Sequence, residues 1–268
     1  MKHCLTIAGS DSCGGAGIQA DLKAFSAHGT YGMSVITAVT AQNTQGVFDV
    51  QDINPSVIAH QIEAIFDDIE VHAVKIGMVS RPETIETIAQ TLKKYSLPPL
   101  VIDPVMISKS GYDLLHPEAK KALIEILLPM ATLITPNIPE AEVIVGYKID
   151  DLEGMKRSAI DLHKLGCKYV LVKGGHLVND ATDVLYDGSQ FYIFEGKRIN
   201  TINTHGTGCT ISSAIASNLA KGLHVKDAVG LAKAYIEKAI EHGFSIGHGV
   251  GPVHHFYELY KKAGVSDA

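Results

Sequence analysis

The 268 residues contain no tryptophan and only four cysteines, and they lack any excess of positive charge. The cysteine spacing includes no Cys-x-x-Cys pair, so it predicts neither a zinc site nor a disulfide framework. Unpaired thiols fit a reducing cytoplasm, where we expect the protein to work. The net charge of −6 gives no indication of nucleic acid as a partner. The cysteines are Cys4, Cys13, Cys167 and Cys209.

Long apolar runs are missing as well. No stretch approaches about 18 uninterrupted apolar residues, so neither a transmembrane helix nor a membrane partner is predicted. The first apolar run is too short for a signal peptide. With 46% hydrophobic and 19% charged residues, the chain can bury a large core, which excludes general disorder. Known nucleotide-binding fingerprints are also absent, since there is no GxxxxGK(S/T) loop and no GxGxxG after the first predicted strand.

The chain instead alternates short apolar runs with longer segments of helical periodicity. The apolar runs predict strands at residues 4–8, 33–39, 46–50, 73–76, 100–103, 132–135, 169–173, 183–186 and 190–194. Helices are predicted at residues 16–28, 55–66, 83–95, 117–127, 139–145, 152–165, 209–220, 225–242 and 253–263. This alternation predicts a single α/β domain over residues 1–268, with a mostly parallel central sheet and helices on both faces.

Three polar residues each stand at the end of a predicted strand. They are Asp103, Thr135 and Lys173. In open parallel sheets, ligands bind beyond the carboxyl ends of the strands. We therefore expect these three side chains at a binding site.

A glycine-rich turn, Gly206-Thr207-Gly208-Cys209, runs into the helix predicted from residue 209. The first turn of a helix has unpaired N–H groups and the positive end of the dipole, which together favour an anion. The same dipole is expected to lower the pKa of the Cys209 thiol. By itself the motif leaves a plainer interpretation open, because such a turn is often only a cap and a lone cysteine is usually a small buried hydrophobe.

A second glycine-rich stretch, residues 9–17, follows the first predicted strand. It lacks the lysine of a phosphate-binding P-loop. Two interpretations remain, a mobile connection or a loop that closes over a small substrate. The polar residues Gln19 and Asp21 directly behind it favour the substrate loop.

Several ordered motifs carry a resemblance that covers residues 4 to 256. They are Thr6-Ile-Ala-Gly-Ser-Asp-Ser-Cys-Gly-Gly-Ala-Gly-Ile-Gln-Ala-Asp21, Thr37-Ala-Val-Thr-Ala-Gln-Asn-Thr44, Lys75-Ile-Gly-Met78, Val101-Ile-Asp-Pro-Val-Met106, Thr135-Pro-Asn-Ile-Pro-Glu140, Lys173-Gly-Gly175 and His205-Gly-Thr-Gly-Cys-Thr210. Together they resemble the ribokinase-like small-molecule kinases. Within that family they are most similar to the hydroxymethylpyrimidine/phosphomethylpyrimidine kinases of thiamin biosynthesis.

The resemblance implies a ribokinase-like three-layer fold and a kinase that uses ATP with Mg²⁺. The enzyme would phosphorylate 4-amino-5-hydroxymethyl-2-methylpyrimidine and then its monophosphate, and it would form a homodimer. Most ribokinase-like kinases carry Asp where this chain has Cys209. The cysteine version resembles the pyrimidine kinases and a related group of pyridoxal kinases. It implies that the Cys209 thiolate is the base that activates the acceptor hydroxyl.

The resemblance also implies the residues that contact the pyrimidine. The Gln42 amide offers a donor and an acceptor in one plane, which suits a ring nitrogen beside an exocyclic amine, although it could simply cap a strand end. Asp21 would bind near the hydroxymethyl group, or it could be a charge on a helix surface. Gly9, Ala16 and Met78 would allow close backbone approach and form an apolar wall.

On the phosphate side, Lys173, Asn137 and Asp103 are expected to bind ATP. The amides of Gly206, Thr207, Gly208 and Cys209 would hold the charge that develops on the transferred group. Glu140 is the expected Mg²⁺ ligand, acting through waters, with Asp103 as a second candidate. Alternatively, Glu140 is an ordinary first-turn carboxylate and Lys173 a solvated residue at a strand end.

Three other functions remain as alternatives. A pyridoxal kinase of vitamin B6 salvage shares the fold and the cysteine base, but Gln42 favours the aminopyrimidine. A nicotinamide-nucleotide hydrate dehydratase is disfavoured because it has Asp at the position of Cys209. A cysteine-dependent hydrolase would act without nucleotide. We interpret His205 as shaping the glycine turn, while His254 and His255 remain unassigned.

Overall fold

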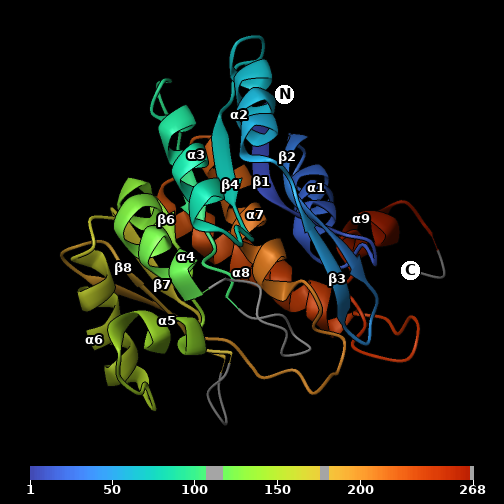
Figure 1. Cartoon of the computed structure of the whole chain (residues 1–268). Coiled ribbons are helices and arrows are strands. Elements are labelled where there is room, and N and C mark those ends of the chain that lie inside the picture. Colours follow the sequence, from blue (N-terminus) through green and yellow to red (C-terminus); the bar gives the residue numbers. More distant parts are fainter. Residues whose placement is uncertain (107–116, 176–180, 266–268) are drawn as a thin grey trace.

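The structure is a computed structural model that describes residues 1–106, 117–175 and 181–265. Within these residues, the strands form one nine-stranded sheet in the order β3-β2-β1-β4-β5-β6-β7-β8-β9 (Figure 1). The strands are β1 (His3–Asp11), β2 (Tyr31–Gln42), β3 (Val47–Asp52), β4 (Ala73–Ile76), β5 (Leu100–Ile102), β6 (Leu133–Ile134), β7 (Tyr169–Val172), β8 (Asp183–Tyr186) and β9 (Phe191–Phe194).

The centre of the sheet is parallel and its two edges are antiparallel. Strands β2, β1, β4, β5, β6 and β7 pair in parallel. Strand β3 pairs antiparallel with β2, and β8 and β9 form an antiparallel extension beside β7. The predicted mostly parallel α/β sheet is therefore confirmed.

Helices cover both faces of the sheet (Figure 1). They are α1 (Gly17–Ala27), α2 (Pro55–Phe66), α3 (Pro82–Leu92), α4 (Pro117–Ala122), α5 (Ile138–Val145), α6 (Leu152–His163), α7 (Thr207–Ala220), α8 (Val225–Glu241) and α9 (Tyr257–Lys262). One buried apolar cluster joins the sheet to α2 through α6, and a second joins it to α1, α7 and α8. The molecule therefore has three layers.

The strand sequences explain why the sheet is buried on both faces. In β1, Leu5 and Ile7 belong to one cluster and Cys4 to the other. In β4, Val74 belongs to the first cluster and Ala73 to the second. Successive side chains of a strand point to opposite faces, so continuous apolar runs are needed where helices cover both sides.

Two predicted helices differ from the observed ones. The helix predicted at residues 117–127 becomes a π-helical turn at Leu123–Leu127 and then a 3-10 turn at Leu128–Met130. Pro129 lies in that second turn and cannot donate the hydrogen bond that would continue an α-helix. The last predicted helix begins only at Tyr257, and before it the backbone N–H of His254 is bonded to the Ala239 carbonyl 2.8 Å away.

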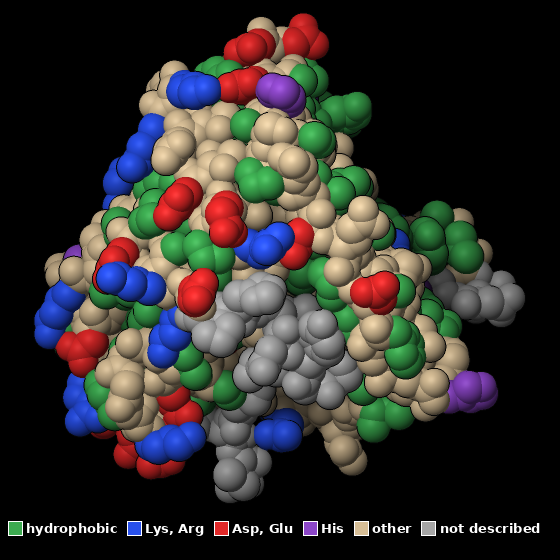
Figure 2. Space-filling model, viewed as in Figure 1, with side chains coloured by type: hydrophobic (Ala, Val, Ile, Leu, Met, Phe, Trp, Pro, Cys, Tyr) green, Lys and Arg blue, Asp and Glu red, His purple; other side chains and the backbone are tan. Residues whose placement is uncertain are grey.

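The chain reverses its direction across the sheet between β1 and β4, which are adjacent although β2 and β3 lie between them in sequence. A crevice at the carboxyl ends of the strands is expected at such a switch point. None of the helices in the described part of the chain is long and apolar enough to cross a membrane. On the face shown in Figure 2, acidic and basic side chains of the described residues are interspersed.

Candidate active site

A pocket of about 470 Å³ opens at the carboxyl ends of β1, β2, β4, β5 and β7. Apolar surface dominates its lining, with a few polar groups, as is usual for small-molecule sites. Twelve of the predicted site residues line it: Gly9, Ala16, Gln42, Met78, Asp103, Asn137, Glu140, Lys173, Gly206, Thr207, Gly208 and Cys209. Sequence patterns from seven separate stretches thus converge on one cavity.

The N-terminus of α7 forms part of the pocket wall. Among the described residues, no side chain caps this helix, and its N-cap Gly206 has a φ of 78°. A Cβ at Gly206 would lie 1.7 Å from the Gly15 carbonyl oxygen, so only glycine fits there. The uncapped first turn leaves backbone N–H groups at the pocket, where an anion can bind them.

Lys173 and Asp103 form an ion pair beside this helix end. The Lys173 Nζ lies 2.7 Å from Asp103 Oδ1, and the Thr135 hydroxyl donates to the same oxygen over 3.0 Å. Burial disfavours a charged Lys173, but Asp103 and Glu140 outweigh this effect and raise its pKa. A Cβ at Gly208 would lie 3.4 Å from the Lys173 Nζ, which places this cation directly beside the glycine turn.

Glu140 and Asn137 form a reciprocal capping box at the start of α5. The Asn137 side chain accepts from the Glu140 N–H, and Glu140 Oε2 accepts from the Asn137 N–H, each over 2.9 Å. Burial raises the pKa of the Glu140 carboxyl to about 7, with Lys173 opposing the shift and Asp103 adding to it. Glu140 is therefore part of the helix cap and of the pocket wall at the same time.

The pKa of Cys209 differs from the sequence-based prediction. We expected the helix dipole to bring the thiol toward neutrality, but burial raises its pKa to about 11. Lys75 lowers this pKa, whereas the Asp21 and Asp103 carboxylates raise it. Loss of solvation therefore outweighs the helix N-terminus, and the prediction of a lowered pKa is wrong.

Asp21 also differs from its predicted place beside the substrate. Its side chain is fully buried and is not among the residues that line the pocket. It accepts hydrogen bonds from Thr6 over 2.6 Å and from Ser213 over 2.7 Å, and it forms an ion pair with Lys75. Asp21 therefore lies behind the pocket wall, because a buried lysine requires a compensating charge there.

Gln42 and an apolar wall also line the pocket. Gln42 is the last residue of β2, and its Oε1 lies 3.2 Å from the Thr40 hydroxyl, which donates to the Ser10 carbonyl over 2.9 Å. A Cβ at Gly9 would lie 3.3 Å from the Met78 sulfur, so the glycine lets Met78 pack directly on the backbone. A flat ring can lie against this wall with its polar edge toward the amide.

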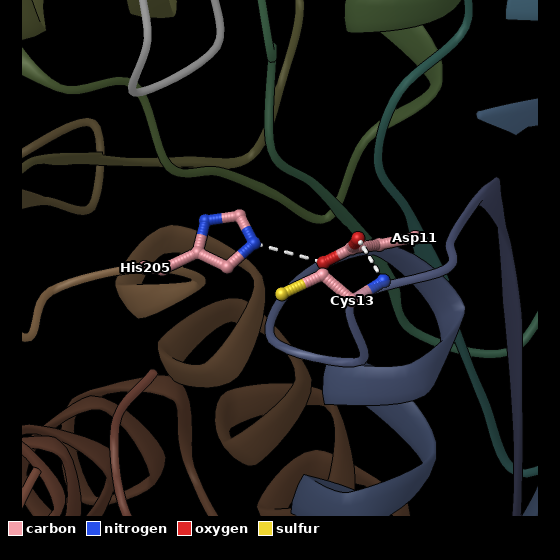
Figure 3. A group of neighbouring side chains, drawn as sticks. All are labelled: Asp11, Cys13 and His205. Carbon is pink, nitrogen blue, oxygen red and sulfur yellow. Dashed lines mark hydrogen bonds and ion pairs between the residues drawn. The ribbon is translucent and has the colours of Figure 1, made fainter. Parts of the chain in front are cut away.

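Sequence reasoning missed Asp11 and treated His205 only as a loop residue, yet both line the pocket. The His205 Nε2 lies 2.8 Å from Asp11 Oδ2, and Figure 3 shows Cys13 next to this pair. The potential ligand atoms of Asp11, Cys13 and His205 lie within 4.8 Å of one another, close enough to hold a metal ion. Asp11 and His205 are 194 positions apart in the sequence, so no local pattern predicted their contact.

Comparison with known proteins agrees with this geometry. The family model described as phosphomethylpyrimidine kinase matches residues 11–254. A hydroxymethylpyrimidine/phosphomethylpyrimidine kinase of Rhizobium meliloti is 53% identical over 262 residues, covering 96% of this chain and 98% of the relative. A crystal structure of phosphomethylpyrimidine kinase from Clostridium difficile has 57% identity and a TM-score of 0.81, covering 90% of this chain and 100% of that one.

A related activity occurs on the same fold. A pyridoxal kinase of Bacillus subtilis, solved as an ADP complex, is 42% identical with a TM-score of 0.90, covering 97% of this chain and 99% of that one. The predicted ribokinase-like fold and the predicted class of phosphotransferase are confirmed. The chain belongs to the phosphomethylpyrimidine kinase family.

Proposed function

We propose that the protein phosphorylates 4-amino-5-hydroxymethyl-2-methylpyrimidine with ATP, and then phosphorylates the monophosphate to the diphosphate. The observation that carries this proposal is the arrangement of the pocket. The Gln42 amide, Cys209 and the uncapped N-terminus of α7 all line the same cavity. An aminopyrimidine bound to Gln42 would direct its hydroxymethyl group toward the helix end.

In this proposal, Cys209 takes the proton of the acceptor hydroxyl. The hydroxyl oxygen then forms a bond to the γ-phosphorus of ATP while the bond to the ADP oxygen breaks. In a loose phosphoryl-transfer transition state, most of the stabilisation comes from positioning and from charge on the equatorial oxygens. The N–H groups of Gly208 and Cys209 and the Lys173 ammonium supply that charge stabilisation.

We also propose that Mg²⁺ accompanies ATP at the Glu140 side of the pocket. The donor set fits this ion, because Glu140 and Asp103 are carboxylates at the same end of the cavity and Mg²⁺ prefers oxygen ligands. When bound, the ion would neutralise charge on the phosphates. Glu140 Oε2 accepts from the N-cap backbone, which supports binding through water.

Pyridoxal is a second candidate acceptor. The likeness to a Bacillus subtilis pyridoxal kinase supports it, since that protein has the same fold over nearly the whole chain. Pyridoxal also carries a hydroxymethyl group on a flat heteroaromatic ring, but it lacks the exocyclic amine that the Gln42 oxygen would bind. The position of Gln42 therefore favours the pyrimidine.

We further propose that the chain acts as a single kinase domain within a cytoplasmic homodimer. The resemblance to the pyrimidine kinases supports the dimer, and four free thiols support a reducing compartment. Analytical ultracentrifugation of the purified protein would test the dimer, and a monomer at micromolar concentration would contradict it.

A coupled assay of ADP release tests the proposed activity. Mg-ATP would be supplied with the hydroxymethylpyrimidine, with pyridoxal, or without an acceptor. We expect turnover that depends on the pyrimidine and exceeds turnover with pyridoxal. Turnover with pyridoxal but not with the pyrimidine would show that pyridoxal is the acceptor. No turnover with either would contradict a kinase of this substrate class.

A further inference from the structure

Helix α8 contains a buried lysine, Lys233, that does not line the pocket. Lysines are rarely buried unless they are paired. The Lys233 Nζ lies 2.9 Å from Asp183 Oδ2, and it also donates to the Ala181 carbonyl. A Cβ at Gly196 would lie 2.7 Å from the same Nζ, so the glycine leaves room for the ammonium group. The fold therefore holds this cation against one particular carboxylate.

Asp183, the first residue of β8, connects Lys233 to the end of the neighbouring strand β7. Its Oδ1 accepts from the backbone N–H of Gly174 over 2.8 Å. Gly174 directly follows Lys173, and a Cβ at Gly174 would lie 1.8 Å from the Thr182 carbonyl oxygen. The two chain segments thus approach too closely for a side chain at this position. The oxygens of Asp183 are divided between the lysine of α8 and the backbone beside Lys173.

The backbone around Lys173 is held on both sides. On the β6 side, the Lys173 N–H donates to the Pro136 carbonyl over 2.9 Å. On the β8 side, the next N–H, that of Gly174, is bound by Asp183. The Lys173 side chain lies beside Asp103 and the start of α7. Because a lysine side chain is a flexible four-carbon stem, the place of its ammonium depends on where its backbone is held.

The charge of Lys233 supports the role of Asp183 as an acceptor. Burial raises the pKa of the Asp183 carboxyl, while Lys233 and the Gly174 N–H oppose this rise. Without the lysine, the carboxyl would either take up a proton or stay charged and uncompensated in the interior. Glu237, on the next turn of α8, lies farther from the Lys233 Nζ, at 3.9 Å, so Asp183 is the main partner of this lysine.

We propose that Asp183, held by Lys233, is a positioning residue for Lys173 at the phosphates of ATP. The Asp183 carboxylate anchors the Gly174 N–H, and the anchored backbone places the Lys173 ammonium beside the N-terminus of α7. The pair thereby supports binding of the nucleotide rather than of the acceptor, although neither residue lines the pocket. This inference rests on the proposed function, in which Lys173 binds ATP.

The test compares two double variants of the full-length protein. Lys233→Met with Asp183→Asn removes both charges but keeps an oxygen that can accept from the Gly174 N–H. Lys233→Met with Asp183→Leu removes the charges and the oxygen while keeping the same branched shape. Lys238→Met is the matched control, because Lys238 lies on the same helix but is exposed and pairs with the exposed Glu241.

Isothermal titration gives the Kd for Mg-ATP, and steady-state kinetics give kcat and the KM for the hydroxymethylpyrimidine. We expect the Asp183→Leu double variant to bind Mg-ATP about tenfold more weakly than the wild type, the effect of losing one hydrogen bond. The Asp183→Asn double variant should stay within about threefold of the wild type, because it keeps the acceptor. The KM for the pyrimidine should change by less than about twofold in both. Lys238→Met should match the wild type.

Equal Mg-ATP affinity in the two double variants would overturn the inference, whether both match the wild type or both are weakened. A pyrimidine KM that rises as much as the Kd for Mg-ATP would overturn it too, because the effect would then be a general loss of structure. If the Asp183→Leu double variant does not fold, Asp183→Ala in the same background removes the same acceptor without adding methyl groups.

Lys173→Gln separates this inference from the proposed function. We expect it to weaken Mg-ATP binding at least as much as the Asp183→Leu double variant does. If Lys173→Gln binds Mg-ATP as tightly as the wild type, the proposed role of Lys173 is wrong, and the inference with it. If Lys173→Gln binds weakly while the two double variants agree with each other, only the inference is wrong.

Discussion

Lys75 and Asp21 form an ion pair that is closed off from solvent in the layer behind the active site. The Lys75 Nζ lies 2.9 Å from both Asp21 oxygens, and both side chains are fully buried. Ser213, which donates to Asp21, follows Cys209 by one turn of α7. Residues four apart share a helix face, so the pair lies on the Cys209 side of α7. It places a permanent cation near the proposed base.

Replacing only one partner of this pair should destabilise the protein strongly. Lys75→Met leaves the Asp21 charge buried without compensation, which costs about 3 to 5 kcal/mol of the free energy of unfolding. Lys75→Met combined with Asp21→Asn removes both charges and should be more stable than the single variant. Urea unfolding followed by circular dichroism measures both. An unchanged unfolding midpoint in Lys75→Met would show that the pair contributes little.

Cys209→Ala should fold and bind ATP but lose most of its turnover. Loss of a general base typically lowers kcat by about 10²- to 10⁴-fold. The substitution removes only one sulfur atom, so the unfolding midpoint should move little. ADP release and ATP titration on the same preparation separate the two effects. Turnover of Cys209→Ala at the wild-type rate would show that Cys209 is not the general base.

The raised pKa of Cys209 also predicts the direction in which activity should change with pH. Because burial raises this pKa to about 11, the thiolate fraction in the free enzyme increases with pH throughout the neutral and mildly alkaline range. The ratio kcat/KM for the acceptor, which reports free-enzyme groups, should therefore rise steadily above pH 7. The same profile in Cys209→Ala should be flat on this side. A wild-type profile that is level above neutrality would contradict the assignment.

Glu140 should control the acidic side of the same profile. Its pKa is raised to about 7, so the carboxylate that would support Mg²⁺ is lost as the pH falls through that value. At subsaturating Mg²⁺ we expect wild-type activity to drop below pH 7. Glu140→Gln, which cannot ionise, should be less active at pH 8 and should keep only the gradual decline set by Cys209, without the steeper fall below pH 7. An unaltered limb in the variant would assign it to another group.

Gln42→Ala should raise KM for the pyrimidine by about tenfold or more and leave KM for ATP nearly unchanged, because in the proposed function the amide, which lines the pocket, binds only the acceptor. Initial rates with each substrate varied in turn measure the two constants. Asn43, the next residue, is exposed and does not line the pocket, so Asn43→Ala is the neighbouring control. Equal changes for both substrates in Gln42→Ala would place the amide elsewhere.

Much of the site was predictable because it is built from strand ends and one helix start. Asp103 and Lys173 each follow an apolar strand, and parallel strands bring such residues to the same edge. The glycines before α7 predicted an uncapped helix end, which the structure contains. These features depend on local sequence and on a general rule of parallel sheets.

What escaped prediction depends on contacts between distant residues. Asp21 looks like a helix-surface carboxylate in sequence, and only its pairing with Lys75, 54 residues away, explains its burial. The contact of His205 with Asp11 has the same character. The prediction of a lowered pKa for Cys209 was wrong for a related reason. The helix dipole is a local feature, whereas desolvation depends on everything packed around the thiol.

The stoichiometry of the reaction tests the central claim most directly. The protein would be incubated with excess Mg-ATP and a limiting amount of the hydroxymethylpyrimidine, and ADP and pyrimidine products would be quantified by mass spectrometry. The account predicts two ADP for each pyrimidine, with the monophosphate appearing first and the diphosphate accumulating. One ADP with the monophosphate as end product, or no ADP with this acceptor, would contradict it.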